Sequence, residues 1–209
     1  MIFIHSTLMD SYELLPDAPI TAKKGVFSQK FIELGILNFK DACMYVHNLD
    51  YGYNSDKDNK WILFMEMRGS CTTKHAVIAT LAQELEILLH KHVGVYKFTE
   101  KICEGASEIT EKYSIPYIPM VHCFLVYKNY RFDLTEGFFN GKKTSIEEFI
   151  HEKQVIPFIS RKDEYNLYKD IIEKYVLSSE EMKGTKKHTI LKGREEAINL
   201  LQRNIEKER

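Results

Sequence analysis

The sequence lacks several features that mark common classes of protein. Its 29 Lys and Arg residues are balanced by 30 Asp and Glu residues, so the net charge is -1 and no excess of positive charge is available to neutralise nucleic-acid phosphates. Its 4 cysteines include no Cys-x-x-Cys pair, which argues against a zinc ribbon or a redox dithiol. We therefore expect no nucleic-acid partner, and neither a metal nor a cofactor is indicated.

Segments that direct a chain to a membrane are also missing. The stretch Met1–His5 has no basic residues in front of a long apolar run, so it does not resemble a signal peptide. No apolar run elsewhere approaches the length of a membrane span. Free thiols fit a reducing compartment, so we expect a cytoplasmic protein that does not associate with membranes.

The composition is otherwise that of an ordinary globular protein. Hydrophobic residues make up 44% of the chain and charged residues 28%. A chain of 209 residues is long enough to bury a core that needs no disulfide bonds or metal ions for stability. Strand-like and helix-like apolar patterns both occur, which predicts an α+β fold. We expect an α+β domain over residues 1–160 and a helical carboxy-terminal extension over residues 161–209, where the helical patterns become strongly charged.

The stretch Arg68–His75 joins two contrasting patterns. Before it, Trp61–Met67 is a short apolar run that predicts a strand. After it, Ala76–Leu89 has the pattern of a long apolar helix. The stretch between them is therefore expected to form a tight connection that begins the helix.

Cys71 is predicted to lie in the first turn of this helix. Gly69 allows the backbone to turn sharply, and Ser70 is a favoured N-cap residue. The N-terminus of a helix favours a thiolate over a thiol, and the thiolate is the nucleophilic form. Cys71 is thus a candidate nucleophile, although a small buried packing residue would fit the same place.

A second helix and a polar loop precede this region. Asn38 is a strong N-cap type, and the apolar residues that follow at helical spacing include Cys43, which we expect in the core. The loop Tyr51–Asn59 contains Asp56 and Asp58, but it lacks the glycine and the closing Glu of an EF-hand, so a solvated loop is the better interpretation than a calcium site.

A β-hairpin is predicted downstream. Val121–Tyr127 and Tyr130–Thr135 have strand patterns, and Lys128 and Asn129 between them suit a short turn. A two-residue loop would place His122 and Asp133 on one face as diagonal neighbours. A three-residue loop would place them on opposite faces.

Cys71, His122 and Asp133 supply the three roles of a thiol triad in that chain order. A nucleophilic cysteine needs a base that takes its proton, and the base needs a group that orients its imidazole. An unpaired buried carboxylate is costly, so Asp133 within an apolar strand needs a partner, and His122 is the nearest candidate.

These motifs resemble the transglutaminase-like core of the papain-related cysteine protease-like superfamily. The resemblance is carried by Gly69–Cys71, by His122–Tyr127 and by Arg131–Thr135, and it covers roughly residues 38–140. Arg68–Cys71 also resembles arylamine N-acetyltransferases, which share that core. The resemblance implies a helix packed on an antiparallel sheet.

The same resemblance implies a chemistry. Cys71 would be the nucleophile, His122 the general base and acid, and Asp133 the orienting residue, in a thiol hydrolase or acyltransferase acting on a protein, a peptide or a small acyl or amide substrate. The substrate class stays open because Thr72 and Leu134 stand where many members have an aromatic residue and a proline.

Four more residues are candidates for substrate or oxyanion contacts. Asn54 and Trp61 lie upstream of Cys71 and carry side-chain donors, beside the main-chain N–H of Cys71 itself. Thr72 follows the cysteine, and His75 lies one helical turn after it on the same face. His75 would serve as a second base, as a substrate contact or as part of the pocket wall.

Two other interpretations remain open. The chain could be a catalytically inactive member of the same fold that serves as a binding or scaffold protein, with the charged tail of residues 178–209 as its docking surface. A weaker hypothesis is a metal site formed by Cys71, His75 and His122, for which the sequence offers no evident fourth ligand.

Overall fold

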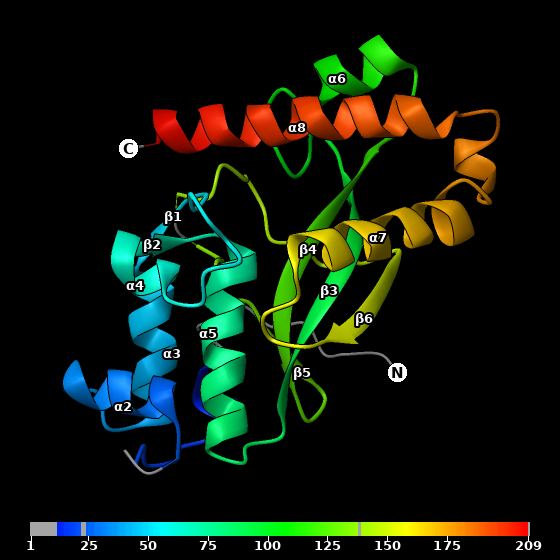
Figure 1. Cartoon of the computed structure of the whole chain (residues 1–209). Helices are drawn as coiled ribbons and strands as arrows, with labels where there is room; N and C mark the ends of the chain where they lie inside the picture. The colour runs from blue at the N-terminus through cyan, green and yellow to red at the C-terminus, as the bar shows by residue number, and fades with distance from the viewer. Residues whose placement is uncertain (1–11, 22–23, 138, 209) are drawn as a thin grey trace. The chain divides into compact units, whose positions relative to one another are not determined.

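The computed structural model describes residues 12–21, 24–137 and 139–208 of the chain (Figure 1). They form a mixed structure of helices and an antiparallel four-stranded sheet, so the α+β prediction is confirmed at this level. The stretch Met1–His5, whose character bears on targeting, lies outside the described residues.

The α-helices and strands follow one another in a mixed order. The α-helices are α2 (Val26–Glu33), α3 (Phe39–Asn48), α4 (Ile62–Glu66), α5 (Cys71–Glu84), α6 (Ala106–Tyr113), α7 (Arg161–Ile171) and α8 (Lys187–Lys207). Shorter helical turns are η1 (Tyr12–Leu14), η2 (Ile172–Val176) and η3 (Glu180–Met182). The strands are β1 (Asp50–Tyr51), β2 (Arg68–Gly69), β3 (Leu89–Phe98), β4 (Ile118–Tyr127), β5 (Tyr130–Phe132) and β6 (His151–Val155).

The sheet confirms the predicted hairpin loop. Its strand order is β5-β4-β3-β6, and β4 and β5 pair antiparallel. Tyr127 opposes Tyr130, so Lys128 and Asn129 form a two-residue loop. Lys128 has a φ of 54°, in the left-handed region that such tight loops use. The register is therefore the one that the two-residue alternative predicts.

The chain divides into two compact units, each with its own apolar core. The first comprises the described residues up to His92, those from Cys123 to 137, and Gln154–Ile159. The second comprises Val93–His122, Phe139–Lys153 and the described residues from Ser160 onward. These units are interleaved along the chain, whereas the predicted domains 1–160 and 161–209 are continuous; that division stays a prediction.

The first unit is organised around α5. In Figure 1, α3 lies beside α5, and both contribute to one core. The side chain of Asn38 accepts a 2.8 Å hydrogen bond from the N–H of Lys40, so the predicted N-cap of α3 is confirmed. Cys43 is fully buried, as predicted, and burial strongly raises the pKa of its thiol.

The predicted strand at Trp61–Met67 is wrong. Residues Ile62–Glu66 form α4, and the left-handed turn that follows it is at Met67, with a φ of 52°. Ile62 and Leu63 are buried while Met65 is exposed, which is the burial pattern of a short helix packed on one side. A short apolar run carries too little periodicity to distinguish these two structures.

Helix α5 is also shorter than predicted. It ends at Glu84, and Glu86 then adopts a left-handed conformation with a φ of 62°. Leu89, the last residue of the predicted helix, instead begins β3. The apolar pattern continues without interruption because both elements contribute to the same core.

The second unit packs helices on its own part of the sheet. Figure 1 shows α6 running alongside α8, and these two helices share the core with α7. Tyr168 on α7 is fully buried and donates a 3.0 Å hydrogen bond to the carbonyl of Pro119 on β4. The long helix α8 thus has a structural role, because its apolar residues contribute to the core of this unit.

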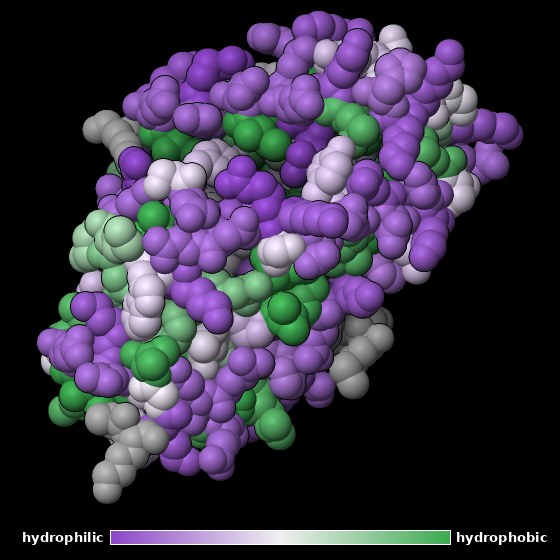
Figure 2. Space-filling model, in the orientation of Figure 1, coloured by the Kyte–Doolittle hydropathy of each residue, from purple (hydrophilic) through white to green (hydrophobic). Residues whose placement is uncertain are grey.

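The surface in Figure 2 is mostly hydrophilic, and its hydrophobic side chains form separate small groups. No helix in the part of the chain that the structure describes is both long and apolar enough to cross a bilayer.

Candidate functional site

Cys71 is the first residue of α5, as predicted. Ser70 precedes it with an extended backbone, at the N-cap position, but its side chain makes no capping hydrogen bond. The cysteine is 9% exposed. Its position therefore combines a helix N-terminus, which favours negative charge, with limited access from solvent.

Gly69 serves close packing and not a sharp turn. It pairs with Tyr51 in the parallel β1–β2 bridge. A Cβ at Gly69 would lie 2.5 Å from the side chain of Leu63 and 2.6 Å from Oγ1 of Thr73. The absence of a side chain lets the segment before Cys71 lie directly against α4 and α5.

Thr72 connects the first turn of α5 to two strands. Its Oγ1 lies 3.7 Å from Sγ of Cys123 on β4. Its carbonyl accepts a 3.0 Å hydrogen bond from Nζ of Lys91 on β3, and the same ammonium donates to the carbonyl of Pro157 at 2.9 Å. Thr72, a candidate substrate contact by sequence, thus has contacts that hold the helix in place.

Thr73 and Asn54 connect the same turn to the polar loop. Oγ1 of Thr73 donates a 2.8 Å hydrogen bond to Oδ1 of Asn54. The Asn54 amide donates to Glu66 and to the carbonyl of Arg68, both at 2.9 Å. Both amide hydrogens are therefore engaged inside the protein, so Asn54 in this conformation holds the segment that leads to Cys71 and does not present a donor to an oxyanion.

Lys74 connects the turn to the end of α3. It is fully buried, and its ammonium donates to the carbonyl of His47 at 3.0 Å and to that of Leu49. The last carbonyls of a helix have no partner within the helix, so a cation is favourable there. Burial lowers the pKa of Lys74 from 10.5 to about 8, and the negative charges of Asp133 and Asp50 partly offset this effect.

His75 connects the turn to the segment after β5. Its Nε2 accepts a 2.8 Å hydrogen bond from the N–H of Leu134, and its Nδ1 lies 2.8 Å from the carbonyl of Cys71. It is fully buried. His75 was expected to be a second base, a substrate contact or part of the pocket wall. Because both of its ring nitrogens contact main-chain groups, the geometry supports the last of these roles.

Asp133 does not lie on a strand, contrary to the prediction. β5 ends at Phe132, and the ladder with β4 stops at the Leu125–Phe132 pair. Oδ1 of Asp133 instead accepts hydrogen bonds from the N–H and the hydroxyl of Thr135, at 2.9 and 2.7 Å. Such local side-chain bonds compete with strand pairing and favour a turn. The carboxylate is buried and lies 3.4 Å from Nε2 of His75.

His122 belongs to the second unit. It is 3% exposed, and its ring meets that of Tyr96 edge-on, with centroids 6.3 Å apart. The next residue in the chain is Cys123, which belongs to the first unit and contacts Thr72. Since β5 ends before Asp133, the predicted diagonal pairing of His122 with Asp133 is not part of the β4–β5 ladder.

Trp61 lies just before α4 and is 38% exposed. Its ring stacks on that of Phe27, with centroids 4.9 Å apart. Aromatic packing of this kind stabilises the contact between α2 and the loop. Trp61 therefore has a packing role. The role of oxyanion donor, which its position in the sequence suggests, stays a prediction.

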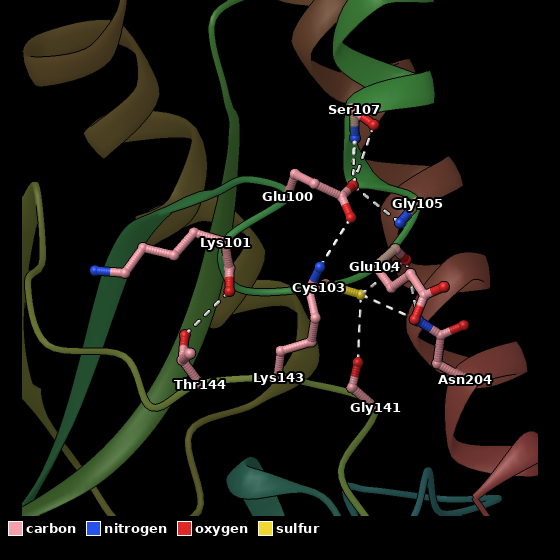
Figure 3. Close-up of polar contacts among 10 residues, drawn as sticks. All are labelled: Glu100, Lys101, Cys103, Glu104, Gly105, Ser107, Gly141, Lys143, Thr144 and Asn204. Carbon is pink, nitrogen blue, oxygen red and sulfur yellow. Dashed lines mark hydrogen bonds and ion pairs between the residues drawn. The ribbon is translucent and has the colours of Figure 1, made fainter.

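Two other thiols are structural. Figure 3 shows Sγ of Cys103 between the carbonyl of Gly141, at 3.3 Å, and the side-chain amide of Asn204, also at 3.3 Å. Burial raises the pKa of Cys103 to about 11. Cys103, like Cys43, is therefore held as a neutral thiol and is a suitable internal reference for the reactivity of Cys71.

The residues that sequence reasoning missed are Lys74 and Lys91. A lysine side chain is rarely fully buried, so neither position suggested a role in the interior. The only available signal for Lys74 was its place on an otherwise apolar helix, one turn after Cys71.

Metal binding finds no geometric support in the first or second unit. Over residues 12–21, 24–137 and 139–208, no group of three or more His, Cys, Asp and Glu side chains is arranged to hold a metal ion.

Comparison of the chain with protein-family models, with curated proteins and with solved structures gives no significant match.

Proposed function

We propose that the protein is a thiol-dependent hydrolase or acyltransferase with a transglutaminase-like core, acting on an amide or acyl substrate through Cys71, His122 and Asp133. The observation that carries this proposal is the anchoring of the first turn of α5. The four residues after Cys71 reach four different parts of the first unit: β3 and β4, the polar loop, the end of α3, and the segment after β5. A nucleophile on so rigid a support suits catalysis.

In the proposed reaction, Sγ of Cys71 attacks the acyl carbon of the substrate, and His122 takes the thiol proton. The tetrahedral intermediate collapses to a thioester on Cys71 when the leaving group departs with the proton from His122. Water or an amine then attacks the thioester and frees the thiol. The main-chain N–H of Cys71, at the helix start, is a natural donor to the oxyanion.

Asp133 would orient the imidazole of His122 and stabilise its charged form. The bonds from Thr135 support this assignment, because they hold the buried carboxylate in one orientation. His75 is not assigned to the base, since its Nε2 already accepts a hydrogen bond.

The test is the pH dependence of iodoacetamide labelling, measured for each cysteine by mass spectrometry, in the wild type and in His122→Ala. We expect Cys71 to label far faster than Cys43 and Cys103 near neutral pH, and to slow in the variant. Substrate screening with amides and thioesters follows, with Cys71→Ala as the inactive control.

A Cys71 that labels no faster than Cys43 would count against the enzyme. The binding or scaffold alternative would then take its place. Removal of residues 178–209 would test that alternative by loss of partner binding.

A further inference from the structure

The second unit contains an open cavity of about 610 Å³. Its walls come from the start of α6, from residues 141–143 in the loop before β6, and from the last turns of α8, all of which belong to this unit. Leu200 supplies part of its apolar surface, and most of the other lining side chains are charged. A volume of about 300–1,000 Å³ is typical of sites that bind small molecules.

Hydrogen bonds hold the three walls of this cavity to one another (Figure 3). The side-chain amide of Asn204 on α8 donates to Sγ of Cys103 and to the carbonyl of Glu104, at 3.3 and 3.2 Å. The thiol of Cys103 donates in turn to the carbonyl of Gly141 at 3.3 Å, and the N–H of Gly141 donates to the carboxylate of Glu208 at 3.2 Å. The cavity is therefore preformed, as small-molecule sites usually are.

The charged side chains that line the cavity are equally divided between the two signs. They are Glu100, Glu104, Glu108 and Glu208, and Lys142, Lys143, Arg203 and Lys207. A balanced lining favours neither an anion nor a cation as the ligand. A metal ion is not indicated either, because the residues that the structure describes contain no group of three or more His, Cys, Asp and Glu arranged to hold one.

Some of these charges are used inside the protein. The ammonium group of Lys143 pairs with Glu100 at 2.9 Å, and the same carboxylate accepts hydrogen bonds from the N–H groups of Gly105 and Ser107 at the start of α6. Four other side chains make no hydrogen bond or ion pair with the described part of the chain: an acidic pair, Glu104 and Glu108, and a cationic pair, Arg203 and Lys207. Each pair therefore lines the cavity without a bonded counter-charge.

The helix ends explain the signs of the two pairs but not their lack of partners. Carboxylates are favourable at the start of a helix and cations at its end. Arg203 and Lys207 are four residues apart on α8, however, and like charges at that spacing repel each other. The positive charge of Arg203 helps to lower the pKa of Glu196, but the hydrogen bond from Lys112 to that carboxylate has the largest effect.

We propose that this cavity binds a small zwitterionic molecule of the amino-acid or short-peptide class. The carboxylate of the ligand faces the cationic pair, where the guanidinium group of Arg203 suits a carboxylate, and its ammonium group faces the acidic pair. One molecule then satisfies both pairs, whereas the acidic pair repels a simple anion and the cationic pair repels a simple cation. The site uses no residue of the proposed thiol mechanism, so it is tested independently of that function.

The experiment titrates the nitrogen-15-labelled protein with glycine and with triglycine and follows the main-chain amide resonances of Gly105, Gly141 and Asn204. We expect a saturable shift of these resonances, and the comparison of the two probes tells whether one amino acid suffices or a peptide is needed. The N-acetylated and the carboxy-amidated forms of the probe each lack one charge. We expect both to bind about tenfold more weakly than the zwitterion.

Substitutions test the two pairs separately. Glu108→Gln and Arg203→Gln each remove one charge from the cavity, and each should weaken binding of the zwitterion about tenfold. Lys192→Gln and Glu195→Gln are the matched controls, since both side chains are exposed on α8 and do not line the cavity. The controls should leave the affinity unchanged. All four positions are exposed, and the amide spectrum itself shows that each variant is folded.

The proposal is overturned if neither glycine nor triglycine gives a saturable shift, or if the control variants weaken binding as much as the cavity variants do. Equal binding of the N-acetylated form would mean that the site takes an anion. Equal binding of the amidated form would mean that it takes a cation. Either result contradicts a zwitterion site.

Discussion

The main-chain N–H of Leu134 donates a 2.8 Å hydrogen bond to Nε2 of His75. Since Nε2 is the acceptor, the ring proton of the neutral imidazole must be on Nδ1, which donates it to the carbonyl of Cys71 at 2.8 Å. The 3.4 Å approach of Nε2 to Asp133 is therefore not a hydrogen bond from the histidine. His75 ties the start of α5 to the residue after Asp133 as a neutral ring.

This geometry predicts the tautomer of His75. In nitrogen-15 NMR spectra at pH 7, its ring should show a protonated Nδ1 and an unprotonated Nε2. His75→Ala should lower the free energy of unfolding by about 2–4 kcal/mol, because it leaves the N–H of Leu134 without its acceptor and opens a cavity. A protonated Nε2 would contradict the assignment and would return His75 to the candidates for acid–base chemistry.

Gly69→Ala should disturb the candidate site through packing. The added Cβ would clash with Leu63 and with Oγ1 of Thr73, the residue that anchors the first turn to Asn54. We expect a loss of about 1–3 kcal/mol in the free energy of unfolding, as for overpacking in a core, and slower alkylation of Cys71.

Gly94→Ala is the matched control for this substitution. Its Cβ would lie 2.2 Å from the ring of Phe149, so a similar clash occurs within the second unit, whereas Cys71 belongs to the first. Denaturant unfolding and labelling kinetics are measured on both variants. If Gly94→Ala slowed the labelling of Cys71 as much as Gly69→Ala, general destabilisation would explain the result.

The features that the sequence predicted correctly depend on local signals. The N-cap of α3 at Asn38, the start of α5 at Cys71 and the two-residue loop at Lys128 and Asn129 are each specified by residues a few positions apart. Capping and turn preferences act over such distances, so they can be read without knowledge of the fold.

The features that were missed depend on contacts between distant residues. Asp133 lies in a turn closed by Thr135 and not on the predicted strand. The carboxylate of Asp133 lies 3.4 Å from Nε2 of His75, a residue that is 58 positions earlier in the chain. The burial of Lys74 depends on carbonyls at the end of α3. No periodicity in the sequence distinguishes such a lysine from one on a solvated helix face.

Lys74 should make the stability of the protein depend on pH in the alkaline range. Its folded pKa of about 8 lies below the unfolded value of 10.5. Below pH 8 the ammonium is charged in both states, and the cost of burying it is constant. Between about pH 8 and 10.5 the folded protein loses this proton and the unfolded chain keeps it, so the contribution of this residue to stability rises with pH.

The measurement compares the wild type with Lys74→Met by denaturant unfolding at pH 7.5 and 9.5. Relative to the variant, the wild type should gain about 2 kcal/mol over this interval, because one pH unit corresponds to about 1.4 kcal/mol for a single proton. The difference between the two proteins isolates Lys74 from the buried thiols and tyrosines, which titrate in both. Lys183→Met is the control, since the Lys183 side chain is 77% exposed and its ammonium carries no burial cost. A constant difference between the wild type and Lys74→Met would mean that the carbonyls of His47 and Leu49 solvate the ammonium group as well as water does, and the lowered pKa would be contradicted.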